Sequence, residues 1–177
     1  LSAAGAIKKR RYDARALDLD FLATGLVRVL DDDHRAKGPW DPKLDAETLR
    51  NGLRHMLLTR IYDERLQRTQ RAGKISFYMR SYGEEAVAVA QCMALQPGDM
   101  LFPSYRQQGF YMVRGRPLVE LMCQLLSNTR DMCKGRQLPV MYHWKEGNIF
   151  SISGNLTTQF PQAVGWAMAA AIKEEPN

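Results

Sequence analysis

Ser104-Tyr105-Arg106-Gln107-Gln108-Gly109 is the stretch of this chain that says most about its architecture. It follows the short apolar run Met100-Leu101-Phe102, which predicts a buried strand, and it precedes a helical pattern that ends near Gly115. In α/β proteins, ligands usually bind in the loops at strand ends. The stretch therefore predicts a binding loop between a strand and a helix.

A second loop of the same kind lies further along the chain. Ile149 to Ile152 predicts another short strand, and a helix rich in alanine begins near Thr158. Strands that alternate with helices favour an α/β fold, with a parallel sheet flanked by helices. Two or three strands are too few for a stable independent sheet, so we expect an incomplete fold.

Two helices are predicted before the first loop. Apolar residues recur at helical spacing from Leu49 to Ile61, and they predict a helix over 46–72. A second, alanine-rich helix from Glu84 to Leu95 is expected to be buried. Glu84 and Glu85 suit the positive end of its dipole, although a catalytic carboxylate pair is an alternative. We expect an extended N-terminal arm over 1–44 and one domain over 45–177.

Composition excludes several classes of protein. The basic run Lys8-Lys9-Arg10-Arg11 could contact nucleic acid or an acidic partner, but a solvated arm is favoured because only one aromatic residue, Tyr12, adjoins it. Three cysteines without paired spacing indicate reduced thiols rather than a disulfide scaffold or a zinc site. No apolar run is long enough to span a membrane. We expect no nucleic-acid or membrane partner.

Five motifs occur in a fixed order along the chain. They are Ile75-Ser76-Phe77-Tyr78-Met79, Tyr82-Gly83-Glu84-Glu85-Ala86, Phe102-Pro103-Ser104-Tyr105-Arg106-Gln107, Lys134-Gly135-Arg136-Gln137-Leu138-Pro139 and Ser153-Gly154-Asn155-Leu156-Thr157-Thr158-Gln159. Together they resemble the alpha subunit of the branched-chain 2-oxo acid dehydrogenase decarboxylase component, in particular its bacterial forms. Several linked motifs in one order form a far more specific signal than any single motif.

The resemblance implies the N-terminal portion of a thiamine diphosphate-binding fold. It also implies an enzyme, 3-methyl-2-oxobutanoate dehydrogenase, that uses thiamine diphosphate with magnesium and potassium. Members of this family form heterotetramers of two alpha and two beta subunits. They decarboxylate branched-chain 2-oxo acids and pass the acyl group to the lipoyl arm of a transacylase. The resemblance implies a bacterial cytoplasm, or a mitochondrial matrix if the source is eukaryotic.

Tyr105 and Arg106 match the family's pair of contacts to the cofactor phosphates. A guanidinium offers forked donors to phosphate oxygens, and a phenol adds one directional donor. Without the family context, an ordinary surface ion pair would be the favoured role for Arg106.

The second loop matches the family's potassium and pyrimidine contacts. Leu156 matches a main-chain contact to the aminopyrimidine ring, and Gly154 matches a cofactor-binding position where many relatives have serine. Glycine supplies no hydroxyl, so a tight turn at this point is an equally good interpretation. The matched potassium ligands are Ser153, Asn155, Thr158 and Gln159.

Phe77 and Leu138 match positions that line the substrate pocket in relatives. A branched aliphatic substrate needs an apolar wall, which contributes about 0.8 kcal/mol for each buried methylene. Plain core packing is an equally good interpretation of Phe77. Many relatives have histidine where this chain has Met141, and the neighbouring His143 does not inherit that role.

The family's Gly-Asp-Gly motif, which holds magnesium and the diphosphate, has no counterpart before Asn177. We therefore expect 45–177 to lack the phosphate-magnesium half of the domain, to contain no catalytic residue, and to be inactive in isolation. Two alternatives stay open. One is the alpha subunit of a pyruvate or acetoin dehydrogenase, whose members usually carry a glycine-rich segment with histidine in place of residues 135–139. The other is a non-catalytic fragment that serves only subunit interaction.

Overall fold

The structure, a computed structural model, describes residues 3–11 and 13–175. The chain divides into two compact units, residues 1–46 and residues 47–177. Tyr12, which adjoins the basic run, and the terminal Pro176-Asn177 lie outside the described residues.

The first unit consists mainly of loops. It contains a short 3-10 helix η1 (Ala16–Leu19), one turn of helix α1 (Phe21–Thr24), and an antiparallel bridge between Leu30 and Ala36. The indole Nε1 of Trp40 donates a hydrogen bond to the carbonyl of Ile7 at 2.9 Å. The side chains of the basic run at 8–11 are exposed, as a solvated arm requires.

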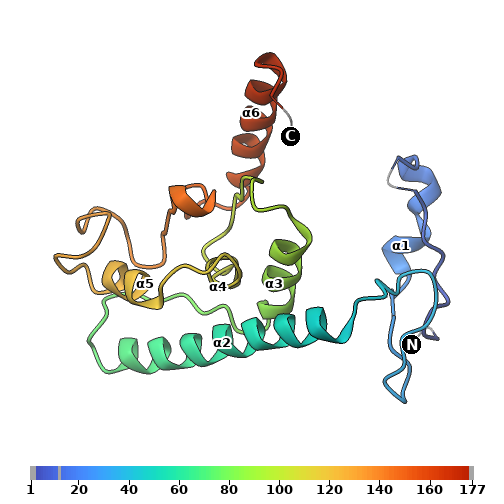
Figure 1. Ribbon diagram of the computed structural model, residues 1–177, viewed down its shortest axis with the longest axis horizontal. Helices are drawn as coiled ribbons and strands as arrows, with labels where there is room; N and C mark the ends of the chain where they lie inside the picture. Colours follow the sequence, from blue (N-terminus) through green and yellow to red (C-terminus); the bar gives the residue numbers. More distant parts are fainter. Residues whose placement is uncertain (1–2, 12, 176–177) are drawn as a thin grey trace. The chain divides into compact units, whose positions relative to one another are not determined.

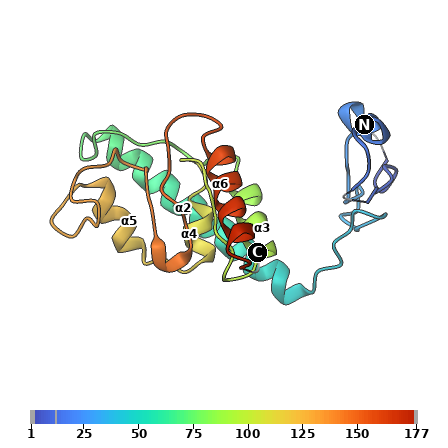
Figure 2. The ribbon, with the colours of Figure 1, turned by 90° about the horizontal axis from the view of Figure 1, so that it is seen from above.

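The second unit is built from helices. They are α2 (Ala46–Arg71), α3 (Glu85–Ala94), α4 (Gly109–Val113), α5 (Leu118–Leu125), the 3-10 helix η2 (Lys145–Gly147) and α6 (Gln159–Ile172). Figure 1 shows α2 as a long helix with α3, α4 and α5 on one side of it, and Figure 2 shows the same helices from above. No helix in the described part of the chain is long and apolar enough to cross a membrane.

Helix α2 confirms the predicted helix but buries an unexpected face. The apolar stripe that predicted the helix is exposed: Leu49 by 56%, Leu53 by 54%, Leu57 by 53% and Ile61 by 62%. The buried residues of α2 are Thr59, Tyr62, Asp63 and Leu66. Polar as well as apolar side chains therefore form the buried face of this helix, and the apolar periodicity alone did not identify it.

Small residues let α3 and α4 approach closely. A Cβ atom added at Gly109 would lie 3.0 Å from the Cβ of Ala88, so only glycine fits at the start of α4 without a shift. The predicted burial of the alanine-rich α3 is confirmed on one face, at Ala88, Val89 and Cys92. Around this contact lies the core, which includes Tyr62, Leu66, Leu101, Tyr111, Leu121, Leu125, Tyr142 and Ile149.

The predicted parallel sheet is not confirmed. Across residues 3–11 and 13–175 no β-strand forms, and the two strand-like segments share one parallel bridge, Leu101 to Ile149. The N–H of Leu101 donates to Asn148 O at 2.8 Å, and the N–H of Phe150 donates to Leu101 O at 2.8 Å. Ile149 also forms an antiparallel bridge to Trp144, but isolated bridges of this kind do not make a stable sheet.

Helix α6 forms where the sequence predicts it, but its small residues do not make the expected close contacts. Among its described residues only Ala170 is buried. In Figure 1, α6 projects from the unit on the side away from α2. Its large apolar side chains are exposed at Phe160, Val164, Trp166, Met168 and Ile172.

Candidate functional site

The bridge between Leu101 and Ile149 brings the two predicted loops to the same edge of the second unit. Because the paired segments run parallel, the chain leaves both of them in the same direction. The side-chain amide of Gln159 donates to the carbonyl of Pro103 at 3.4 Å, which links the second loop to the first. The structure therefore brings 103–108 and 153–159 together.

An open cavity of about 340 Å³ lies where these two loops meet. Side chains from both loops and from the start of α6 line it: Phe102, Ser104, Gln107, Gln159, Phe160 and Ala163. Apolar walls with a few convergent amide and hydroxyl groups are typical of a small-molecule site.

The first loop is fixed by its own glutamines. The N–H of Ser104 donates to Oε1 of Gln107 at 2.7 Å. Gln108 is buried, and its Nε2 donates to the carbonyl of Tyr105 at 3.0 Å and to that of Met79 at 3.1 Å. These bonds hold the backbone of Tyr105 and Arg106 in one conformation.

Arg106 lies at the rim of this loop with its guanidinium partly exposed. Nη1 donates to the carbonyl of Arg80 at 2.6 Å, and Nε lies 3.9 Å from Oε1 of Glu84. The guanidinium sits 5.6 Å from the centre of the Tyr105 ring. A guanidinium has five donors, so the bond to Arg80 leaves donors available to an anion.

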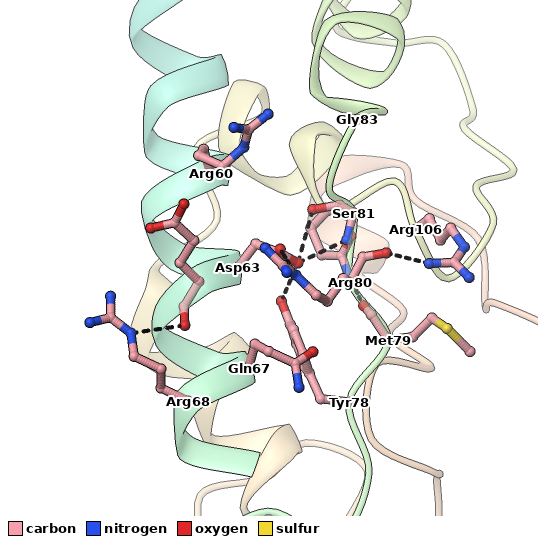
Figure 3. Close-up of polar contacts among 12 residues, drawn as sticks. Arg60, Asp63, Gln67, Arg68, Tyr78, Met79, Arg80, Ser81, Gly83 and Arg106 are labelled. Carbon is pink, nitrogen blue, oxygen red and sulfur yellow. Dashed lines mark hydrogen bonds and ion pairs between the residues drawn. The ribbon is translucent and has the colours of Figure 1, made fainter. Parts of the chain in front are cut away.

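A buried carboxylate that the sequence did not single out supports this arrangement. Asp63 of α2 is fully buried and accepts four hydrogen bonds from residues 78–81 (Figure 3). The donors are Tyr78 Oη at 3.1 Å, Arg80 Nε at 2.9 Å, Ser81 N at 2.8 Å and Ser81 Oγ at 3.3 Å. Burial, with the Asp63 charge as a further cause, raises the pKa of Tyr78, so its hydroxyl stays a donor.

A second carboxylate joins α2 to α3. Glu85, also buried, accepts from Arg60 Nε at 2.5 Å and from the N–H of Gly83 at 3.0 Å. The hydrogen bond from Arg60 is the main cause that lowers the pKa of Glu85. Glu84 does not pair with it, and lies on the side of Arg106 instead. The two acids therefore have separate partners, which favours the helix-start interpretation over a catalytic pair.

The second loop forms a turn held by local hydrogen bonds. The N–H of Asn155 donates to Ser153 Oγ at 3.3 Å, and Thr158 Oγ1 donates to the carbonyl of Asn155 at 3.0 Å. The side chain of Leu156 is 75% exposed. Hydroxyl and carbonyl oxygens thus gather within one turn, and oxygen ligands of this kind suit a hard cation such as potassium.

The other predicted residues surround the second loop or lie farther away. A Cβ atom at Gly154 would lie 3.3 Å from Cε of Met141, so 127–148 contacts this turn. Phe77 packs against the core, partly buried. Leu138 is 53% exposed, and its carbonyl accepts from Gln124 Nε2 at 2.9 Å.

An acidic metal site is absent from residues 3–11 and 13–175. No group of three or more His, Cys, Asp or Glu side chains there is arranged to hold a metal ion. The geometry therefore provides an arginine with donors to spare and an oxygen-rich turn. It provides no carboxylate cluster for magnesium among these residues.

Sequence reasoning missed Asp63 and the role of Gln108. Both are polar residues inside the core, and both bond to the segment 78–81, which is distant from them in sequence. The one available signal was position: Asp63 falls on the same helical face as Thr59 and Leu66, one turn away in each direction. Their mixed polarity hides that face from an analysis of apolar periodicity.

Residues 53–177 match the family model of the dehydrogenase E1 component. The chain is 57% identical over 173 residues to the 2-oxoisovalerate dehydrogenase subunit alpha of Pseudomonas aeruginosa, an alignment that covers 98% of this chain and 42% of that relative. It is 43% identical over 146 residues to the mitochondrial 2-oxoisovalerate dehydrogenase subunit alpha of Mus musculus, with 82% of this chain and 33% of the relative covered. The chain thus spans well under half the length of these curated relatives.

Proposed function

Because the chain belongs to the dehydrogenase E1 component family, we propose that it forms the N-terminal part of a branched-chain 2-oxo acid dehydrogenase alpha subunit. In this proposal the complete enzyme decarboxylates branched-chain 2-oxo acids such as 2-oxoisovalerate and transfers the acyl group to a lipoyl domain. The observation that carries it is the meeting of the Tyr105-Arg106 loop with the oxygen-rich turn at 153–159.

Tyr105 and Arg106 bind the diphosphate of the cofactor. Thiamine diphosphate, when bound, supplies the stabilised carbanion that decarboxylation of a 2-oxo acid requires. The free donors of the Arg106 guanidinium form charge-assisted hydrogen bonds to phosphate oxygens. The bonds from Gln108 prearrange the loop, so little ordering is needed when the cofactor binds.

The second loop orients the other end of the cofactor. The backbone of Leu156 contacts the aminopyrimidine ring, and Gly154 lets the chain approach it closely without a side chain between them. Oxygens of Ser153, Asn155, Thr158 and Gln159 would hold a potassium ion, which would fix the shape of the turn. The Thr158 hydroxyl already bonds within the turn, at 3.0 Å from Asn155 O, which supports this assignment.

Phe77 and Leu138 form the apolar wall for the branched substrate. Phe77 packs on the core and so gives a rigid surface, while Leu138 is exposed and free to contact a ligand. Each methylene that this wall buries contributes about 0.8 kcal/mol to binding. An apolar wall therefore favours 2-oxoisovalerate over pyruvate.

The partners in this proposal are a beta subunit, in an assembly of two alpha and two beta chains, and the lipoyl-bearing transacylase. Magnesium, a hard cation, needs oxygen ligands beyond the pair Tyr105 and Arg106. We expect the 177-residue chain alone to bind the cofactor weakly and not to turn over. Its subunit-facing surface includes the exposed stripe of α2 at Leu49, Leu53, Leu57 and Ile61.

The test is a substrate comparison on the complete enzyme. The alpha subunit that contains this chain is assembled with its beta subunit, and decarboxylation is measured with thiamine diphosphate and magnesium. We expect kcat/KM for 2-oxoisovalerate to exceed that for pyruvate by at least about tenfold, the value of two buried methylenes. A preference for pyruvate would instead support a pyruvate dehydrogenase alpha subunit.

A further inference from the structure

We propose that Asp63 is a positioning residue for the diphosphate site, acting through residues 78–81 on Arg106. This inference rests on the proposed function and names a residue that lies outside the cofactor-contacting set. The carboxylate touches neither candidate loop. It fixes the segment from which Arg106 is held.

The carboxylate of Asp63 is fully committed to this one segment. Its Oδ1 accepts from Tyr78 Oη, Ser81 N and Ser81 Oγ, and its Oδ2 accepts from Arg80 Nε. The residue is 0% exposed. A buried carboxylate with four donors holds both itself and its partners firmly, because loss of any bond leaves a charge or a polar group unsatisfied.

The same segment holds the candidate phosphate loop through its backbone. Met79 O accepts from Gln108 Nε2 at 3.1 Å, and Arg80 O accepts from Arg106 Nη1 at 2.6 Å. In Figure 3, Asp63 points to this segment from α2, and Arg106 approaches it from the other side. Arg80 is therefore the link, since its side chain bonds to Asp63 and its carbonyl bonds to Arg106.

Charge also matters in this arrangement. The ion pair between Asp63 and Arg80 neutralises the Arg80 guanidinium, at 2.9 Å between Oδ2 and Nε. Among the described residues, the carboxylate paired with Arg106 is that of Glu84, loosely at 3.9 Å. The guanidinium of Arg106 is thus left to an anion while that of Arg80 is occupied.

The structure contains a matched control for Asp63. Glu85 is a second buried carboxylate in an ion pair with an arginine, here Arg60 of α2. It binds the N–H of Gly83 and fixes the start of α3. Its side-chain hydrogen bonds go to Arg60 and Gly83, neither of which belongs to 103–108. Loss of this carboxylate should affect folding but not the position of Arg106.

The test uses the complete alpha subunit assembled with its beta subunit. Asp63→Asn keeps the shape and the oxygen that faces Ser81, but it points an N–H₂ donor at Arg80. Calorimetric titration with thiamine diphosphate and magnesium should show a dissociation constant raised about tenfold, the usual size of an outer-shell effect. Glu85→Gln, the same chemical change, should lower the melting temperature and leave that constant within about twofold.

A double-mutant cycle separates positioning from general destabilisation. If Asp63 acts through Arg106, Asp63→Asn should weaken binding far less in an Arg106→Ala background than in the wild type. Full additivity of the two changes would overturn the inference. An unchanged dissociation constant in folded Asp63→Asn would do so as well.

Should Asp63→Asn fail to fold, Arg80→Gln gives the same test from the exposed end of the ion pair. Asp63 keeps its bonds to Tyr78 and Ser81 in this variant. We expect the dissociation constant for thiamine diphosphate to rise about threefold, and we expect no such rise in the Arg106→Ala background. An Arg80→Gln effect that persists in full in that background would overturn the inference. Failure of the proposed function would give a different result, because the wild-type enzyme itself would then not bind thiamine diphosphate.

Discussion

The two candidate loops sit at the same edge of the second unit, yet they are held in different ways. The loop at 103–108 is bound from within by Gln108 and from α2 through residues 78–81. The loop at 153–159 has short-range hydrogen bonds and one amide bond, from Gln159 to Pro103, and exposes most of its residues. One loop is prearranged by the protein, and the other relies on what binds to it.

This difference suits two kinds of ligand contact. A phosphate is bound best by donors that are already in position, because ordering a flexible arginine reduces the affinity gained. A turn that encloses an ion needs oxygens close together, and the ion itself completes the shape. Mutations should therefore act on stability at the first loop and on ion dependence at the second.

The largest expected effect is at Gln108. Gln108→Ala leaves the partly buried carbonyls of Met79 and Tyr105 without this donor and opens a small cavity at the buried Gln108 side chain. We expect the free energy of unfolding to fall by about 3 kcal/mol, the sum of an unsatisfied buried group and a cavity. Urea denaturation measures it. Gln91→Ala, at an exposed glutamine, is the control, and an equal loss there would show that Gln108 has no special role.

The next effect concerns pH and the carboxylate of Glu85. Its pKa is lowered in the folded state, chiefly by the hydrogen bond from Arg60. The stability that this pair contributes is complete above the ordinary glutamate pKa and is lost as pH falls through the lowered, folded-state value. Glu85→Gln should therefore cost about 1.5 kcal/mol at neutral pH and flatten the acid limb of the stability profile.

Thermal unfolding measured between neutral pH and pH 3 checks this expectation. The conformation of the loop at 103–108 should not change, because Glu85 fixes the start of α3 instead. A Glu85→Gln profile parallel to the wild type through the acid range would contradict the assignment.

A smaller effect is expected at Thr158 in the second loop. Thr158→Val removes the hydroxyl that donates to Asn155 O, and we expect the free energy of unfolding to fall by about 1 kcal/mol. In the complete enzyme, replacing sodium ions in the buffer by potassium ions should raise the melting temperature of the wild type but not that of this variant. Thr157→Val is the matched neighbour, and an equal loss of potassium dependence there would contradict the assignment of Thr158.

The smallest effect is expected at Gly154. A Cβ atom there meets only Cε of Met141, the movable end of a flexible side chain. Gly154→Ala should change the free energy of unfolding by less than about 0.5 kcal/mol. Gly109→Ala, where the Cβ meets Ala88 at 3.0 Å and the backbone N of Val89 at 3.4 Å, should cost about 2 kcal/mol. Thermal unfolding of both variants tests this difference. Similar losses of stability in Gly154→Ala and Gly109→Ala would contradict it.

The helices were predictable because their signals are local. Apolar spacing placed α2, and the pattern after Thr158 placed α6, close to the bounds that the structure shows. The parallel sheet was not confirmed, since strand pairing depends on partners far apart in sequence, and the two predicted strand segments share one parallel bridge, Leu101 to Ile149.

Within the site, the motif residues came from the resemblance, whereas their support did not. Asp63 could not be predicted from local pattern, because its four donors lie fifteen to eighteen residues away in the chain. The apolar stripe of α2 is exposed, although its spacing identified the helix correctly. Apolar spacing shows that a helix forms, but it does not show which side the rest of the chain covers.

The central claim is that Arg106 binds the diphosphate of thiamine diphosphate. Its most direct test is calorimetric titration of the assembled enzyme, wild type and Arg106→Ala, with thiamine diphosphate and magnesium. We expect the dissociation constant to rise by about 10- to 100-fold in the variant, the value of hydrogen bonds to a charged group. An unchanged constant in a folded, assembled Arg106→Ala enzyme would contradict the account.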